Sequence, residues 1–292
     1  MLVPENKSFW FMKWQKNLLQ LLFISSVLAA CSDNSNDGPA TTESAATTNT
    51  PPAASTETLK SDAKEKRSDA SAQRLKDKVQ TMSESVFTGQ NAKDLTYKNV
   101  FKYDKNGNRL ELSNYKSDGA LVSTIRSAYD SSGKVVGEET VLSNGIVDIK
   151  SVIKTDENGN RVQQDDIKQG GSGSLFNYKY IYKYDAKAHL IERQGYRGNG
   201  SFFLKYNFTY DANDDRTEWL QLTQANQIIF RVAYKYDDKH NIIEETKYNP
   251  DNTVKDAFTY SYEFDKKGNW TTQKKMQNGT VVEVRKREYK YY

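Results

Sequence analysis

The sequence has very few of the residues on which disulfides and metal sites depend. It contains one cysteine, Cys31, and two histidines, His189 and His240, in 292 residues. A single cysteine cannot form an internal disulfide, and two histidines are too few for a His-rich metal site. We therefore expect no cofactor and no structural metal. The 19 Tyr, 12 Phe and 4 Trp can still supply a buried core, because aromatic side chains carry a large area each.

The sequence also lacks an excess of charge of one sign. Removing residues 1–30 takes away three lysines and one glutamate, which leaves 39 basic (42 less 3) and 37 acidic (38 less 1) residues. Both signs are interspersed, as is typical of a solvated surface and not of a nucleic-acid-binding face. We expect no nucleic-acid partner.

Catalytic motifs are absent as well. No Gly-x-Ser-x-Gly, phosphate-binding loop or His-Glu-x-x-His occurs, so we expect no enzymatic activity. The triplet Asp104-x-Asn106-x-Asn108 looks like the start of a calcium loop, but Gly107 stands at position four and not six. Turn chemistry is the better interpretation. We interpret His189 and His240 as equivalent turn residues that tolerate a positive φ, and not as catalytic or metal-binding residues.

The N-terminus carries the features of an export signal. Basic residues precede an apolar segment at 17–30, which is too short to span a bilayer as a helix and ends in small residues. Cys31 follows directly after Leu-Ala-Ala. This arrangement resembles the signal of bacterial lipoproteins, which implies removal of residues 1–30 and a lipid anchor on Cys31. Ser32 resembles the residue that favours sorting to the outer membrane, so we expect an anchored protein of the cell envelope.

Two segments of different composition follow the cysteine. Residues 31–59 are rich in Ser, Thr, Ala and Pro without any aromatic residue, which predicts a disordered tether. In residues 60–88, Leu75, Val79, Met82 and Val86 recur at spacings of four, three and four. That spacing predicts a short amphipathic helix that caps the next domain.

Residues 92–292 form seven copies of one repeat. Each copy contains an aspartate in a similar setting, and the spacings between successive aspartates are 26, 26, 29, 26, 26 and 28 residues. Such a steady period is typical of repeat architectures. The reference residues are Asp104, Asp130, Asp156, Asp185, Asp211, Asp237 and Asp265.

Each copy predicts two strands joined by a turn. In the fourth copy, apolar Tyr178, Tyr180, Tyr182 and Tyr184 alternate with mostly polar residues, which predicts a strand with one buried face. Asp-x-x-Gly-Asn then supplies the turn, because Asp caps backbone N–H groups and Gly accepts a positive φ. The structural turn residues that we single out are Asp104, Gly107, Gly133, Gly159 and Gly268. Six residues after most of the aspartates an apolar residue returns, as at Leu110 and Ile191.

The predicted fold class is all-β: a tandem array of antiparallel β-hairpins with about fourteen strands, preceded by a short N-terminal helix. Because open sheets of more than about ten strands curl, we expect a curled or spiral sheet. The Tyr-x-Tyr-Asp-x-x-Gly-Asn pattern over about residues 95–292 resembles the YD repeats of bacterial RHS proteins. That resemblance implies a spiral sheet and links shorter members to adhesion or carbohydrate binding.

The function that these features favour is a non-catalytic envelope lipoprotein that acts as a binding or scaffold module. The expected partners are the membrane, through Cys31, and a glycan or an envelope protein. One alternative is a glycan-binding adhesion protein with a Tyr-rich groove near Tyr180, Tyr206, Tyr234 and Tyr260. A remote alternative is a transmembrane β-barrel, which the lysines between the aromatic residues disfavour.

Overall fold

The computed structural model describes residues 68–89, 92–170 and 177–292. These residues form one four-residue helix, α2 (Asp69–Ala72), and sixteen strands. The strands are β1 (Val79–Thr88), β2 (Asp94–Tyr103), β3 (Arg109–Lys116), β4 (Leu121–Tyr129), β5 (Val135–Leu142), β6 (Val147–Thr155), β7 (Arg161–Lys168), β8 (Tyr178–Tyr184), β9 (Leu190–Arg197), β10 (Phe202–Tyr210), β11 (Arg216–Leu222), β12 (Ile228–Tyr236), β13 (Ile242–Tyr248), β14 (Val254–Phe264), β15 (Trp270–Gln277) and β16 (Thr280–Tyr291). The described residues contain no helix with the length and hydropathy of a membrane span.

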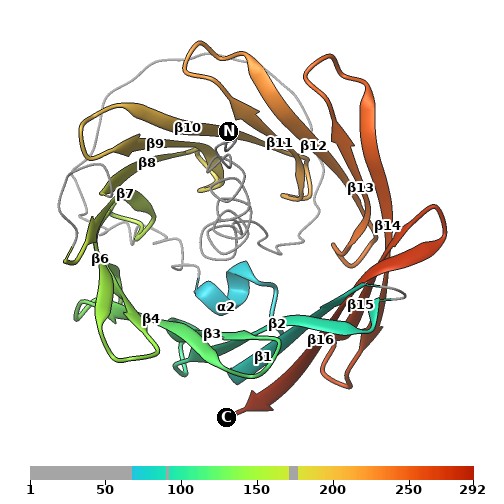
Figure 1. The fold of residues 1–292 in the computed structure, drawn as a ribbon, viewed down its shortest axis with the longest axis horizontal. Coiled ribbons are helices and arrows are strands. Elements are labelled where there is room, and N and C mark those ends of the chain that lie inside the picture. The colour runs from blue at the N-terminus through green and yellow to red at the C-terminus, as the bar shows by residue number, and fades with distance from the viewer. Residues whose placement is uncertain (1–67, 90–91, 171–176) are drawn as a thin grey trace, which may run out of the picture.

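The strands form a closed barrel (Figure 1). Each strand pairs antiparallel with its neighbours in sequence, and β1 pairs with β16 to complete the ring. The expected curled or spiral sheet of YD-type hairpins is therefore wrong. Closure leaves no strand edge with unpaired N–H and C=O groups, which an open array of this length would expose at both ends.

The predicted helical cap over residues 60–88 is also wrong within the described residues. Only Asp69–Ala72 is helical, and Val79–Thr88 is β1. In β1, Met82, Glu84 and Val86 are all buried at alternate positions, which is the period of a strand. The two-residue period of this strand was not recognisable in the sequence, because the acidic residue Glu84 at a buried position interrupts the apolar alternation. The barrel thus begins at β1, ahead of residue 92.

Alternate side chains of every strand face the inside of the barrel. Met82 of β1 stands opposite Phe101 of β2, which stands opposite Leu112 of β3. All three pack in one cluster with Ala70 of α2, and α2 lies inside the ring. The register therefore identifies this row as inward-facing, and the residues between them face outward.

The outward face carries charges in register. Lys102, Glu111, Arg126, Glu139 and Lys150 stand directly opposite one another across the five strands β2 to β6. The signs alternate along this row. Its ion pairs include Lys102–Glu111 at 2.9 Å and Lys150–Glu139 at 3.2 Å. The two lysine side chains are 55% and 52% exposed, so this part of the outer wall is an exposed, charged surface.

The Asp turns all follow one plan. The Asp104 carboxylate accepts hydrogen bonds from the backbone N–H groups of Asn106 (2.8 Å) and Asn108 (2.9 Å), and the Asn108 amide donates to it as well. The strand register shifts by one residue beside this turn, which is a β-bulge. The four glycines of the predicted turns all have a positive φ, namely Gly107 (+80°), Gly133 (+76°), Gly159 (+80°) and Gly268 (+82°).

Three copies place another residue at the glycine position. Ala188, Asp214 and His240 have φ values of +65°, +62° and +64°. His189 is not equivalent to His240, contrary to our interpretation, because it stands one position later and replaces the asparagine. Its Nδ1 lies 2.8 Å from Asp185 Oδ2, the contact that Asn108 makes with Asp104 in the first copy. His189 is thus a turn-capping residue.

Candidate functional site

The predicted binding tyrosines all lie on the inner wall of the barrel. Tyr180, Tyr206, Tyr234 and Tyr260 belong to β8, β10, β12 and β14. Tyr180 and Tyr206 are 1% and 5% exposed, and the other two are half-buried. The guanidinium of Arg193 lies 4.4 Å from the centre of the Tyr180 ring, within the range of a cation–π contact. The barrel therefore brings the four rings to one wall but not to one open groove.

Two of these hydroxyls bond to other inner-wall side chains. Trp219 Nε1 donates to the Tyr234 hydroxyl at 3.0 Å, and the Tyr260 hydroxyl donates to Glu245 Oε2 at 2.6 Å. Burial raises the pKa of Tyr260 and the adjacent Glu245 charge raises it further, so this hydroxyl stays protonated as a donor. These bonds favour packing as one role of the rings, since they satisfy groups that burial would otherwise leave unpaired.

A second set of tyrosines joins neighbouring repeats, a role that sequence reasoning missed. In four copies of the repeat, the tyrosine directly before the turn aspartate donates its hydroxyl to a backbone carbonyl of the preceding copy. In each case this carbonyl belongs to the residue five positions after the aspartate of that preceding copy. That carbonyl belongs to the first residue of a strand, beside the bulge. The bonds are Tyr129 to Arg109 (2.8 Å), Tyr184 to Arg161 (3.0 Å), Tyr210 to Leu190 (3.1 Å) and Tyr236 to Arg216 (2.7 Å). The recurrence of Tyr-Asp in the sequence was the signal that could have indicated these hydrogen bonds.

Charged residues on the inner wall form three groups in which one carboxylate contacts two cations. The groups are Glu84 with Arg285 (3.3 Å) and Arg287 (2.8 Å), Glu138 with Arg109 (2.8 Å) and Arg161 (3.1 Å), and Glu245 with Lys275 (3.0 Å) and Lys247 (3.4 Å). Burial acts to raise the pKa of Glu138, but the charges of Arg161 and Arg109 outweigh it. The pKa of Glu138 therefore lies below its ordinary value, and the carboxylate stays ionised. Glu283 also pairs with Arg285 at 2.8 Å, so the group around Glu84 holds two carboxylates and two guanidinium groups. The inner wall is polar at these places.

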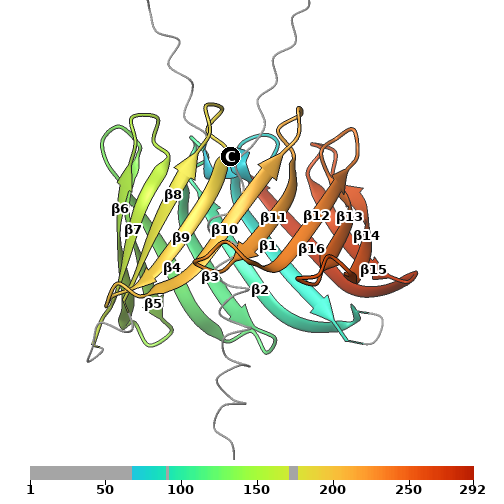
Figure 2. The ribbon, with the colours of Figure 1, turned by 90° about the horizontal axis from the view of Figure 1, so that it is seen from above.

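Residues 68–78, which we call the N-terminal strap, cross one mouth of the barrel. Ala70 N–H donates to Gly107 O at 2.9 Å in the β2–β3 turn, and Lys76 N–H donates to Asn269 Oδ1 at 2.7 Å in the β14–β15 turn. Arg74 forms an ion pair with Asp215 in the β10–β11 turn. The β2–β3 and β10–β11 turns lie halfway round the ring from one another, so the strap joins opposite sides of this mouth. Figure 2 shows α2 at this end of the barrel.

Metal ligands do not gather anywhere in the described part of the chain. Within residues 68–89, 92–170 and 177–292, no group of three His, Cys, Asp or Glu side chains could hold a metal ion. The carboxylates of the Asp-x-Asn triplets bond to backbone N–H groups of their own turns instead. Cys31, with the expected signal at 1–30 and tether at 31–59, lies outside the described residues.

Comparison with known proteins identifies the fold but no family. No family model matches the sequence, and no curated protein matches it. A porin-like protein from Bacteroides uniformis matches the structure with a TM-score of 0.51 at 10% identity, over 73% of this chain and 96% of that one. The chain therefore shares the fold of that protein.

Two further solved structures match more loosely. A porin-like protein from Bacteroides vulgatus has a TM-score of 0.48 at 10% identity, over 73% of this chain and 98% of that one. A putative outer membrane lipoprotein-sorting protein domain from Vibrio parahaemolyticus has a TM-score of 0.22 at 10% identity, over 73% and 83%. Neither score establishes a shared fold. The expected relation to RHS and YD repeats gains no support from these comparisons.

Proposed function

We propose that the chain is a non-catalytic binding protein of the bacterial cell envelope, tethered by a lipid on Cys31 and surrounded by water on its outer wall. The charged outer face is the observation that carries this proposal. A barrel that spans a membrane presents an apolar band about 25 Å tall to lipid, and a lysine or arginine at the middle of that band costs about 2–4 kcal/mol. The row Lys102–Glu111–Arg126–Glu139–Lys150 would place five charges in such a band.

Charges recur on other parts of the outer wall. Lys183 lies 2.6 Å from Glu192 between β8 and β9, and Lys235 lies 2.8 Å from Glu244 between β12 and β13. Both lysines stand between inward-facing tyrosines, which places them on the outer face. Water stabilises such charges, so the distribution favours a barrel in an aqueous compartment of the envelope.

The anchor and the compartment are inferred from the sequence. The lipoprotein-like signal ending at Cys31 supports export, and Ser32 supports the outer membrane. The tether of residues 31–59 would let a barrel beside the membrane reach its partner. A glycan is the ligand class that we propose, and the tyrosines and paired charges of the inner wall support it.

A membrane-spanning barrel is the second candidate, because the chain shares its fold with a porin-like protein. The outer charges oppose it. The N-terminal strap crosses one mouth, so a membrane-spanning barrel of this kind would be plugged at that end.

Cell fractionation of the Cys31→Ala protein tests both candidates. If the barrel is surrounded by water, the variant is released as a soluble protein without detergent, while the native protein stays with the membrane and takes up a labelled fatty acid. If the variant stays in membranes after an alkaline carbonate wash, the membrane-spanning barrel is correct. Equal fatty-acid labelling of both forms would remove the lipid anchor from the proposal.

A further inference from the structure

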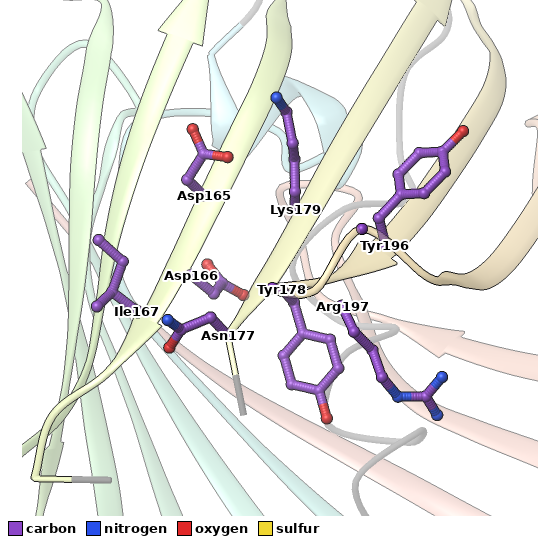
Figure 3. A pocket seen from close by; sticks show the side chains of 10 residues that line it. Asp165, Asp166, Ile167, Asn177, Tyr178, Lys179, Tyr196 and Arg197 are labelled. Carbon is purple, nitrogen blue, oxygen red and sulfur yellow. The ribbon is translucent and has the colours of Figure 1, made fainter. Parts of the chain in front are cut away.

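A cavity of about 290 Å³ lies where β7 and β8 meet the β9–β10 turn (Figure 3). Two neighbouring rows of side chains line it. Asp165, Lys179 and Tyr196 stand opposite one another on the outward face of β7, β8 and β9. In the inward row, Asp166 stands opposite Tyr178, which stands opposite Arg197. The cavity therefore touches both faces of the wall at its rim.

Some acceptor atoms in this cavity are already engaged. The Asp166 carboxylate accepts from Ser151 Oγ at 2.6 Å and from Gln164 Nε2 at 2.7 Å. Asn177 Oδ1 accepts from the backbone N–H of Lys168 at 3.0 Å. Asp165 faces Lys179 across the strands.

Arg197 and Tyr178 supply donor groups to this cavity. Arg197 is half-buried with its guanidinium 5.1 Å from the centre of the Phe203 ring, and it forms no ion pair with any side chain of the described residues. The Tyr178 hydroxyl forms no hydrogen bond within the same residues. The guanidinium fork of Arg197 matches the two oxygens of a carboxylate.

The aromatic side chains add a preference for a flat, ring-shaped ligand. The Tyr178 ring packs 5.2 Å from Phe203 and 6.4 Å from Tyr180, centre to centre, so its orientation is fixed. The cavity volume lies just below the range of about 300–1,000 Å³ for small-molecule sites, which suits a single ring. A sugar ring combines a face that stacks on an aromatic residue with hydroxyls that can bond to the Tyr178 hydroxyl and to the amide of Asn177.

We propose that this cavity binds an acidic sugar residue, with its carboxylate on Arg197 and its ring against Tyr178. The proposal rests on the proposed binding function and names the ligand class. It also moves the site from the central tyrosines of the inner wall to the rim at β7 to β9.

Titration calorimetry of the full chain carrying Cys31→Ala tests this assignment with galacturonate, galactose and acetate. We expect galacturonate to bind at least tenfold more tightly than galactose or acetate, since only galacturonate offers both the carboxylate and the ring. Arg197→Ala should weaken galacturonate binding about tenfold or more. Arg197→Lys should restore only part of it, because lysine lacks the planar fork. Arg126→Ala, which removes an arginine from the outer wall, is the matched control and should bind as the parent does.

Three outcomes would overturn the assignment. Equal affinity for galactose would show that the carboxylate is not recognised, and equal affinity for acetate would reveal a simple anion site. Unchanged galacturonate binding in Arg197→Ala at an unchanged melting temperature would place the ligand elsewhere. The titration works in buffer or in detergent, so its result is independent of the fractionation result for the proposed function.

Discussion

Replacing Tyr236 with phenylalanine tests whether the tyrosine before each aspartate holds neighbouring repeats together. The Tyr236 hydroxyl donates to Arg216 O at 2.7 Å, and burial raises the pKa of Tyr236, so the donor keeps its proton. Tyr236→Phe removes only this bond and leaves the ring in place. A lost hydrogen bond costs about 0.5–1.5 kcal/mol, and a carbonyl left without a partner costs about 1–3 kcal/mol. We expect a loss of about 1–2 kcal/mol in the free energy of unfolding.

Thermal and urea unfolding followed by circular dichroism measure this loss. For a domain of this size each kcal/mol lowers the melting temperature by about 2–4 °C. Tyr115→Phe is the matched control, because Tyr115 faces outward and its hydroxyl makes no hydrogen bond within the described residues. If Tyr236→Phe and Tyr115→Phe unfold at the same temperature and urea concentration, the bond between repeats contributes nothing and the recurrence of Tyr-Asp needs another cause.

Three further changes probe the fold. Ala188→Gly should stabilise the protein by about 1 kcal/mol, because Ala188 holds a φ of +65° that costs a residue with a Cβ about 1–2 kcal/mol; an unchanged or lower melting temperature would contradict this. Gly195→Ala should destabilise the protein by about 1–3 kcal/mol, since the new Cβ would lie 2.9 Å from Leu204 Cγ and 3.2 Å from the Tyr180 ring. An unchanged urea midpoint would show that the neighbouring side chains move to accommodate the methyl group. Because the pKa of Glu138 is lowered in the folded state, its contribution is present above the unfolded pKa of about 4.3 and is lost as pH falls through the lower folded pKa. Melting curves from pH 7 to pH 3 should therefore fall less steeply below about pH 4.3 for Glu138→Gln than for the parent, and parallel curves would refute the role of this carboxylate.

Local chemistry in the sequence was sufficient to predict the turns and most of the strands. Asp104 with Gly107 specifies a turn by itself, because the carboxylate caps nearby N–H groups and only glycine takes a positive φ without cost. The alternation of Tyr178, Tyr180 and Tyr182 likewise predicts a strand with one buried face, and Tyr180 and Tyr182 are buried on that face.

Features that depend on partners far along the chain were not predictable from the sequence. Closure of the ring requires β1 to pair with β16, some 200 residues later, and β1 was mistaken for a helix because Glu84 occupies a buried position. Only the tertiary structure places Arg285 and Arg287 beside Glu84 and so makes its burial possible.

The bulges decided which side of the wall a residue faces. Leu110 and Ile191, the apolar residues that return after the turns, are exposed on the barrel. Each follows a register shift beside its turn, and a shift of one residue moves side chains to the opposite face of a strand. The sequence by itself thus determined the hairpins of this protein, while the bulges and long-range pairing determined that they close into a barrel with a polar inner wall and a charged outer one.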